Sequence, residues 1–247
     1  MWYKQIRDFK REYNLLLIDL PGHGGNTEGL LHMPDHNSHA LYETAGQILH
    51  VLDHYKIQRA HFLGLSLGTI VIHVIEEIEP DRIMSKVLGG SVEYLYIPIV
   101  KFFKSLRGIL SLMPYMWLYK IVALCLMPRK RNKEARFLFV NEAVKLGKQE
   151  FFKWYELLYA EVNRFYDNRK STCTKPVLFI MGDEDYVFLP ILRNRIHRYK
   201  NGTLHVLEQC GHVCNIEKHE QFNELALDFL KSNINVEHTY YATEKVV

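Results

Sequence analysis

One stretch, HFLGLSLGT at residues 61–69, constrains the fold of this chain more than any other. Apolar residues lead into a Gly-x-Ser-x-Gly pattern centred on Ser66, and a second apolar run, residues 70–75, follows at once. A serine between two glycines, with an apolar strand before it and an apolar helix after it, indicates a sharp strand-to-helix turn. Such a turn holds its backbone tightly and pushes the serine hydroxyl outward over the sheet edge. We expect that a Cβ at Gly64 or at Gly68 would collide with the turn and the helix.

Strand patterns and helix patterns alternate along most of the chain. Short apolar runs predict strands at residues 14–20, 61–64, 83–88, 176–181 and 203–207. Apolar residues at helical spacing predict helices over residues 2–13, 41–55, 70–75, 190–199 and 222–230. The run at residues 14–20 is continuous rather than alternating, as expected of a parallel strand that is covered on both faces. The alternation predicts an α/β fold, in which helices wrap a mostly parallel sheet.

The segment from residue 92 to residue 166 departs from this pattern. It is helical, rich in aromatic residues and Met, and contains no clear strand. Its nearly apolar part, residues 108–127, is interrupted by Pro114 and Lys120, so we expect an inserted helical unit and not a membrane span. The basic run at residues 129–131 is more typical of a solvated helix end than of a membrane contact. We therefore predict a core of residues 1–91 and 167–232, a helical cap at 92–166 and a polar tail at 233–247.

Charge and cysteine content exclude several classes of protein. A formal net charge of +3 over 247 residues is too small to imply a nucleic-acid partner. Four cysteines in a chain of this length predict free thiols and a reducing compartment, and therefore the cytoplasm. The residues after Met1 read as an amphipathic helix and not as a signal peptide. Cys210, His212 and Cys214 could suggest a metal site, but no second ligand cluster accompanies them, so we expect no metal and no cofactor.

Three reactive residue types follow three different predicted strands. Ser66, Asp185 and His212 each come just after an apolar strand run, and the carboxyl ends of parallel strands meet at one edge of the sheet. A serine hydroxyl is a weak nucleophile unless a base removes its proton, and histidine is suited to that role. A carboxylate behind the imidazole fixes its tautomer. The sequence thus predicts a catalytic site of Ser66, His212 and Asp185. The plainer alternatives are that Asp185 or Asp183 caps a turn and that His212 is structural.

From residue 2 to about residue 231 the chain resembles the α/β-hydrolase superfamily. The motifs that carry the resemblance are DLPGHG at residues 19–24, GLSLG at 64–68, GDED at 182–185 and GH at 211–212. The chain order serine, aspartate, histidine is that of the superfamily. The resemblance implies that Asp185 rather than Asp183 is the acid, that the backbone N–H of Leu67 helps to hold an oxyanion, and that residues 92–166 roof the site. It also implies a structural role for the loop of Asp19 and His23. A serine in the elbow argues against haloalkane dehalogenases and epoxide hydrolases.

The resemblance also implies a segment that residues 1–13 do not provide. In the superfamily a buried strand precedes the first helix, lies between the strands that correspond here to residues 14–20 and 61–64, and ends in a loop that supplies the second oxyanion donor. We therefore expect a truncated chain, with unpaired backbone groups where that strand would lie. Loss of one oxyanion donor would lower kcat by about 10²–10³.

These observations predict a serine hydrolase that cleaves a small carboxylic ester or thioester through an acyl-enzyme, with an apolar substrate. The superfamily also contains C–C bond hydrolases, enol-lactonases and perhydrolases, which the motifs do not separate from esterases. A rival from another class is a ligand-binding protein with a hydrolase fold and little or no turnover. A weaker one is a lipid-surface protein that docks through residues 108–136. The oligomeric state does not follow from the sequence.

Overall fold

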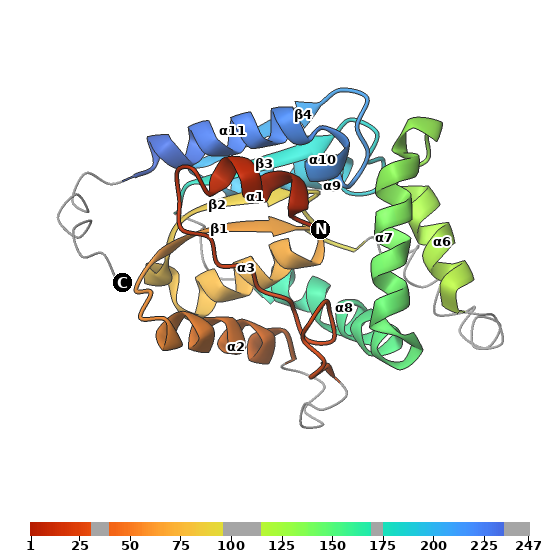
Figure 1. Ribbon diagram of the computed structural model, residues 1–247, viewed down its shortest axis with the longest axis horizontal. Coiled ribbons are helices and arrows are strands. Elements are labelled where there is room, and N and C mark those ends of the chain that lie inside the picture. Colours follow the sequence, from red (N-terminus) through yellow and green to blue (C-terminus); the bar gives the residue numbers. More distant parts are fainter. Residues whose placement is uncertain (31–39, 96–114, 169–174, 235–247) are drawn as a thin grey trace.

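Four apolar runs form one parallel sheet, with the strands in the spatial order β1-β2-β3-β4 (Figure 1). The structure is a computed structural model that describes residues 1–30, 40–95, 115–168 and 175–234. The strands are β1 (Ala60–Leu65), β2 (Ile83–Gly89), β3 (Val177–Gly182) and β4 (Gly202–Leu207). Every neighbouring pair is parallel. Because a parallel pair needs a crossover connection, helices cover the two faces of the sheet. The α/β class predicted from the sequence is confirmed.

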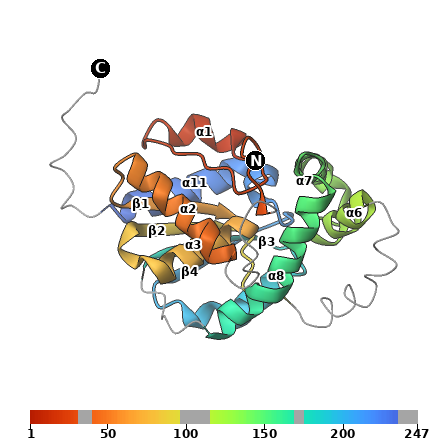
Figure 2. The same ribbon diagram turned by 90° about the horizontal axis from the view of Figure 1, so that it is seen from below.

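Helices lie on both faces of this sheet (Figures 1 and 2). Helices α1 and α11 lie together on one face, and α2 packs on α3 on the other. The helices are α1 (Tyr3–Phe9), α2 (Ala40–His54), α3 (Leu67–Ile78), α6 (Tyr115–Leu126), α7 (Lys133–Leu146), α8 (Lys148–Asn168), α9 (Leu189–Arg195), α10 (Cys214–Glu217) and α11 (His219–Ser232). Short 3₁₀ turns occur at Pro80–Arg82, Lys130–Asn132 and Ile196–Arg198. The first helix is shorter than predicted, since a turn replaces its last residues.

The side chains of strand β3 contribute to two hydrophobic clusters, one on each face of the sheet. Its side chains alternate between the faces of the sheet. Leu178 and Ile180 belong to the cluster that contains Phe222 of α11, whereas Phe179 and Met181 belong to the larger cluster on the opposite face. All six residues of the strand are buried. A run that is apolar at every position is therefore what this central strand requires, as the sequence indicated.

The strand predicted at residues 14–20 is wrong. The segment forms neither a strand nor a helix, and its apolar side chains are exposed by 39% at Leu15, 56% at Leu17 and 36% at Ile18. The physical reason is the absence of a partner: β1 is the edge of the described sheet on this side, and no described strand lies between it and residues 14–20. An apolar run without a neighbouring ladder has nothing to satisfy its backbone groups as a strand.

A charged cluster is buried between α3 and β2. The Lys86 ammonium of β2 lies 2.5 Å from a carboxylate oxygen of Glu76, and His73 lies 3.2 Å from Glu93, which follows β2. The four side chains are almost fully inaccessible to solvent. Glu93 also accepts hydrogen bonds from Ser91 and Tyr199. Because each charge has a partner of opposite sign or a hydrogen-bond donor, the cluster joins the two elements at their core.

Helices α6, α7 and α8 make up most of the described part of residues 92–166. In Figure 1 α6 and α7 lie beyond the end at which the β1 arrow points. No strand occurs in the described part of this segment, while the first residues of the apolar stretch 108–127 lie outside the described residues. The division of the chain into core, cap and tail stays a prediction, and nearly all of the tail at 233–247 is likewise not described. Among the helices that the structure describes, none has the length and apolarity needed to span a bilayer.

Candidate active site

Ser66 stands alone between β1 and α3, in a backbone conformation that side chains rarely adopt. Its φ is 51° and its ψ is −116°, and its N–H donates to the carbonyl oxygen of Gly89 at 3.0 Å. A Cβ on Gly64 would lie 2.9 Å from the carbonyl carbon of Gly68, so the expected steric need for glycine holds at Gly64. The same expectation is wrong for Gly68, where an added Cβ meets nothing within 4 Å. Gly68 lines the large cavity described below, and its side-chain position therefore faces open space.

The structure brings the three predicted reactive side chains into one hydrogen-bonded chain. The Oγ of Ser66 lies 2.8 Å from Nε2 of His212, and Nδ1 of the same imidazole lies 2.7 Å from Oδ2 of Asp185. The residues come from the loops after β1, β4 and β3, which meet at one edge of the sheet because the strands are parallel. With Nδ1–H donating to the carboxylate, Nε2 carries the free lone pair and can accept the serine proton.

Two aspartates in the loop after β3 have different partners. Asp185 is fully buried, and its Oδ1 accepts the N–H of Phe188 at 3.0 Å while its Oδ2 faces His212. Asp183 instead accepts the N–H of Cys210 at 3.1 Å, and so joins the loop after β3 to the loop that carries His212. The geometry therefore places Asp185, and not Asp183, against the imidazole.

Two further contacts hold His212, and the sequence analysis did not identify them. The ring centroids of Phe188 and His212 are 5.3 Å apart. The backbone N–H of His212 donates to the carbonyl oxygen of Leu126 at the end of α6. Phe188 follows Asp185 by three residues, which is the only sequence signal for its place. The Leu126 contact has no local signal, because it depends on how α6 docks against the loop after β4.

The start of α3 presents backbone donors beside Ser66. The first N–H groups of a helix have no intrahelical acceptor and carry partial positive charge. Leu67 is the first residue of α3, and it lines the same cavity as Ser66 and His212. Its predicted part in holding an oxyanion stays a prediction.

The loop after residues 14–20 is tied down by polar contacts. Oδ2 of Asp19 accepts the N–H of Gly25 at 2.8 Å, and the carbonyl oxygen of Pro21 lies 3.0 Å from Nδ1 of His23. The Pro21 oxygen also accepts the indole N–H of Trp154 in α8. Burial lowers the pKa of His23, against smaller opposing effects of the Pro21 hydrogen bond and nearby carboxylates. These contacts connect the loop to α8 and give both polar side chains a structural task.

The cysteines near His212 are poor metal ligands. Cys125, Cys210 and Cys214 are free thiols, as predicted, and Cys173 lies outside the described residues. Burial raises the pKa of Cys214 to about 12, and it raises that of Cys210 as well. Metal binding requires thiolates, which burial disfavours here. Across the described ranges no group of three His, Cys, Asp or Glu side chains is arranged to hold a metal ion.

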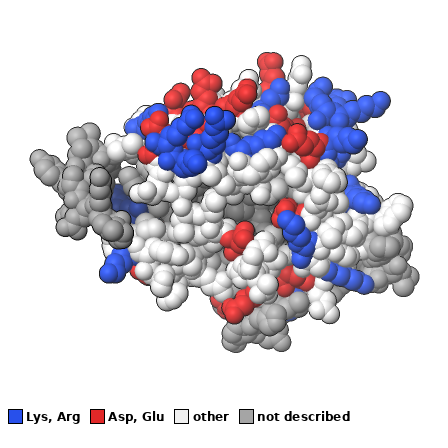
Figure 3. Space-filling view, in the orientation of Figure 1, with Lys and Arg blue, Asp and Glu red and all other residues white. Residues whose placement is uncertain are grey.

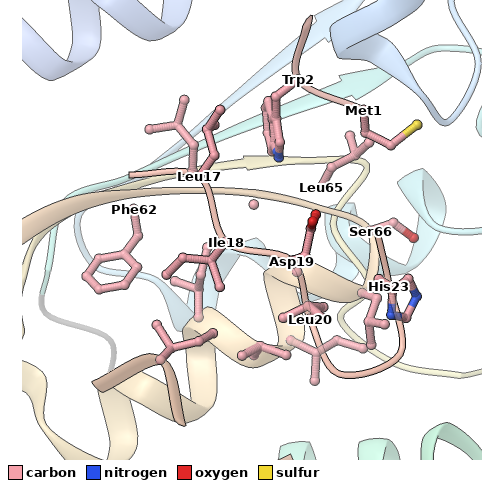
Figure 4. A pocket seen from close by; sticks show the side chains of 18 of the residues that line it. Met1, Trp2, Leu17, Ile18, Asp19, Leu20, His23, Phe62, Leu65 and Ser66 are labelled. Carbon is pink, nitrogen blue, oxygen red and sulfur yellow. The ribbon is translucent and has the colours of Figure 1, made fainter. Parts of the chain in front are cut away.

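A cavity of about 930 Å³ opens onto Ser66 (Figure 4). The face of the molecule in Figure 3 is hollowed near its centre, where most surrounding atoms belong to uncharged residues. The described lining of this cavity is mainly aliphatic and aromatic. Most of it comes from residues 1–20, which include α1, and from α2, β1, α3 and helices α6 to α8. Charged side chains are few in that lining: Asp19, Glu142 and Arg59. Ser66 thus faces a large and mostly apolar space.

Comparison with known proteins places this arrangement in a family. The 2-hydroxy-6-oxononadienedioate/2-hydroxy-6-oxononatrienedioate hydrolase of Cupriavidus pinatubonensis is 29% identical over 237 residues, covering 88% of this chain and 76% of the relative. The monoacylglycerol lipase abhd6-A of Xenopus laevis is 24% identical, covering 94% and 72%. The solved enol-lactonase of Burkholderia xenovorans LB400 superposes with a TM-score of 0.73 at 20% identity, covering 93% of this chain and 85% of that one. The family model described as "alpha/beta hydrolase fold" matches residues 1–219, and the chain therefore belongs to the α/β hydrolase family.

Proposed function

We propose that this α/β hydrolase cleaves a carboxylic ester or thioester through an acyl-enzyme formed on Ser66. The observation that carries the proposal is the continuous hydrogen-bonded chain from the Ser66 hydroxyl through His212 to Asp185. It is the arrangement needed to remove a proton from a serine and return it to a leaving group.

The two half-reactions follow from these contacts. Ser66 Oγ bonds to the substrate carbonyl carbon while its proton moves to Nε2 of His212, and the carbonyl oxygen becomes an oxyanion beside the Leu67 N–H. The carbon–oxygen or carbon–sulfur bond then breaks, and the leaving alcohol or thiol takes the proton from His212. A water molecule, deprotonated by His212, releases the acid and restores Ser66. Asp185 stabilises the imidazolium in both halves.

The residues that line the cavity favour a substrate with a neutral, apolar acyl group. Arg59 is the one Lys or Arg in the described lining, and it precedes β1, whereas Ser66 follows that strand. At about 3.3 Å per residue the two are separated by roughly 20 Å along the strand. Glu142 of α7 and Asp19 add carboxylates to the wall, which disfavours a substrate with free carboxylates.

A second candidate is hydrolysis of a C–C bond next to a carbonyl group. The relative that is 29% identical is named as a hydrolase of a dienedioate. Ser66, His212 and Asp185 would act in such a reaction too. The carboxylates in the cavity wall count against a dianionic substrate of that kind. We also propose the cytoplasm as the site of action, because the described cysteines are free thiols.

Active-site labelling tests the nucleophile. The purified chain is treated with a fluorophosphonate and weighed intact, beside Ser66→Ala and His212→Ala. We expect one adduct on the parent chain and none on Ser66→Ala or His212→Ala. An unlabelled parent chain that is folded by circular dichroism would contradict the proposal and favour a ligand-binding protein.

A matched pair of variants tests the carboxylate. Asp185→Asn is expected to lower kcat/KM by about 10³–10⁴, because the imidazole then favours the wrong tautomer. Asp183→Asn keeps the acceptor for the Cys210 N–H and should change kcat/KM less than about 10-fold. Equal losses of kcat/KM in the two variants would contradict the proposed role of Asp185 beside His212.

A substrate series separates the two reactions. p-Nitrophenyl esters of acetate, butyrate and octanoate are compared with the dienedioate named for the relative. We expect kcat/KM to rise with acyl length, since each added methylene is worth about 0.8 kcal/mol of burial. Turnover of the dienedioate alone would favour the C–C hydrolase.

A further inference from the structure

A half-buried carboxylate, that of Glu217, lies behind the loop that contains His212. Its Oε2 accepts the backbone N–H of Gly211, the residue before His212, at 2.9 Å. The same oxygen accepts a hydrogen bond from the side-chain amide of Asn132. Glu217 is the last residue of the short helix α10, which follows the loop directly. One carboxylate oxygen thus joins the loop after β4 to a segment that is remote in sequence.

That segment is the connection between α6 and α7, residues 126–132, hereafter the α6–α7 connection. Asn132 is fully buried, and its Oδ1 accepts the backbone N–H of Arg129 at 2.7 Å. This contact uses the acceptor of the amide and leaves its NH2 group to donate to the carboxylate. Leu126 adds a second contact, because its carbonyl oxygen accepts the backbone N–H of His212 at 3.3 Å. The α6–α7 connection therefore holds the His212 loop at two successive residues.

The α6–α7 connection also contacts the loop after β3. The guanidinium of Arg131 donates to both carboxylate oxygens of Glu184, which precedes Asp185 in the chain. The backbone N–H of Glu184 in turn donates to the carbonyl oxygen of Cys210 at 2.8 Å. Because Arg131 is about half exposed, water weakens this ion pair, and we expect it to matter less than the contact of the buried Asn132.

The His212 loop has little room to move without its neighbours. A Cβ added at Gly211 would lie 2.9 Å from Oε1 of Glu217 and 3.1 Å from Cγ of Met127. Nε2 of His212 lies 2.8 Å from Oγ of Ser66, so a shift of the loop by about 1 Å would break that hydrogen bond. Displacements of this size in a reacting site cost up to about 10²-fold in rate.

The carboxylate of Glu217 depends on the same two donors. Burial raises its pKa, and the hydrogen bonds from Gly211 and Asn132 are the largest effects that oppose this rise. Within the described residues its other oxygen, Oε1, is buried without a hydrogen-bond partner. An ionised carboxylate that lost either donor would be costly at this position, so the three groups hold one another in place.

We propose that Glu217 is a positioning residue, which fastens the loop of His212 to the α6–α7 connection and so keeps the imidazole within reach of Ser66 and Asp185. The inference rests on the proposed function, because positioning matters to a reaction only if these residues perform it. Helices α6 and α7 also line the cavity beside Ser66. A substrate that shifts these helices would therefore change how the imidazole is held.

An exchange of donor and acceptor tests the contact. Asn132→Asp keeps the acceptor for the Arg129 N–H, but it removes the donor to Glu217 and sets two carboxylates against each other. In the double variant, Asn132→Asp with Glu217→Gln, the new NH2 group can donate to the new carboxylate while its oxygen accepts the Gly211 N–H. Glu208→Gln, at an exposed position of the same loop, is the matched control.

Two measurements are made on each chain that is folded by circular dichroism. Hydrolysis of p-nitrophenyl butyrate gives kcat and KM. Nuclear magnetic resonance of chains with ¹⁵N-labelled histidines follows the proton on Nδ1 of His212, which is shifted far downfield when it is bonded to Asp185. The signal is assigned by its loss in His212→Ala. The second measurement reports where the imidazole lies, whether or not the chain hydrolyses the ester.

We expect Asn132→Asp to lower kcat by about 10–100-fold and to change KM by less than about 3-fold, because positioning acts on the reaction and not on binding. The downfield signal should weaken in Asn132→Asp. The double variant should regain the signal and come within about 5-fold of the parent kcat, and Glu208→Gln should match the parent chain.

An unchanged signal in Asn132→Asp would overturn the positioning role, and so would a loss that the double variant does not reverse. A parent chain that shows the signal without hydrolysis would contradict the proposed function alone, and the signals of the variants would still decide the positioning role. If Asn132→Asp does not fold, Glu217→Ala is compared with Glu217→Gln, which keeps an acceptor for the Gly211 N–H. Equal signals in these two variants would overturn the inference.

Discussion

Two runs of similar composition, NLLLIDL at residues 14–20 and VLFIMG at residues 177–182, have opposite fates in this molecule. The second is a fully buried strand with parallel neighbours on both sides, β2 and β4. The first has no ladder, and Leu17 exposes 56% of its surface. Composition and periodicity are nearly the same, so the difference must come from the neighbours that each run finds.

The comparison teaches that a continuous apolar run is a necessary condition for a central strand but not a sufficient one. Such a strand also needs partners for its peptide groups, and those partners are remote in sequence. The following measurements test this difference between the two runs.

The largest contrast is expected in amide hydrogen exchange. The amides of Phe179 and Ile180 should exchange only through near-global unfolding, whereas those of Leu16 and Leu17 should exchange through small local openings. For a domain that is stable by 5 kcal/mol or more, the rates should differ by about 10³-fold or more. Similar protection in the two runs would mean that residues 14–20 are paired in solution.

Side-chain truncation should give the next largest contrast. Phe179 is fully buried, and its ring lies 4.9 Å from that of Tyr199. Phe179→Ala should therefore lower the free energy of unfolding by about 3–5 kcal/mol. Leu17→Ala should change it by no more than about 0.5 kcal/mol. Urea unfolding followed by circular dichroism measures both, and a large loss in Leu17→Ala would contradict the exposed placement of that residue.

Acidification should lower the free energy of unfolding by a smaller amount, and we expect part of this loss to come from Glu93, which follows the paired strand β2. Burial by itself raises the pKa of Glu93, but the charge of His73 and hydrogen bonds from His73, Tyr199 and Ser91 outweigh it and lower this pKa to about 2. A carboxylate with a lowered pKa stabilises the fold above about pH 4.3, and that stability is lost as the pH falls toward about 2. The loss should be on the order of 3 kcal/mol.

The variant Glu93→Gln tests the source of that acid sensitivity. It should be less stable at neutral pH, because it removes the carboxylate that lies 3.2 Å from His73, and its stability should fall less steeply below about pH 4. Glu220→Gln, at an exposed position of α11, is the matched control and should follow the parent curve. Unfolding by urea at a series of pH values provides the measurement. An unchanged acid slope in Glu93→Gln would exclude this carboxylate as its source.

Thiol labelling is the last and smallest of the expected contrasts, and it should separate buried cysteines from exposed ones. Burial raises the pKa of Cys210 and of Cys214, so iodoacetamide at pH 8 should leave both unmodified in the folded chain. Cys125 is exposed and should be alkylated. Peptide mapping after labelling locates the adducts. Rapid modification of Cys214, which lies against β3, would show that this part of the core opens readily.

Much of the fold could be predicted from the sequence because its signals are local. The apolar periodicity placed β2, β3, β4, α2 and α11 to within a few residues. The site is also partly local, since Ser66, Asp185 and His212 each follow a strand and parallel strands end at one edge. That geometry requires no knowledge of which strands are neighbours.

The remainder depends on contacts between elements that are distant in sequence. Lys86 interrupts an apolar strand and Glu76 an apolar helix, but only the packing of α3 on β2 shows that they neutralise each other. The same holds for residues 14–20, whose pattern is that of a strand and whose partner does not exist among the described residues. The contact of Leu126 with His212 depends on the docking of α6 in the same way.

The backbone of Ser66 has a consequence for how this chain would respond to selection for heat resistance. A residue other than glycine at a φ of 51° and a ψ of −116° costs on the order of 1–3 kcal/mol. Glycine at this position would relieve most of that cost, so Ser66→Gly should melt at a higher temperature than the parent chain while losing the hydroxyl. A library screened for thermal stability alone would therefore enrich changes at the elbow that remove the hydroxyl on which the proposed reaction depends.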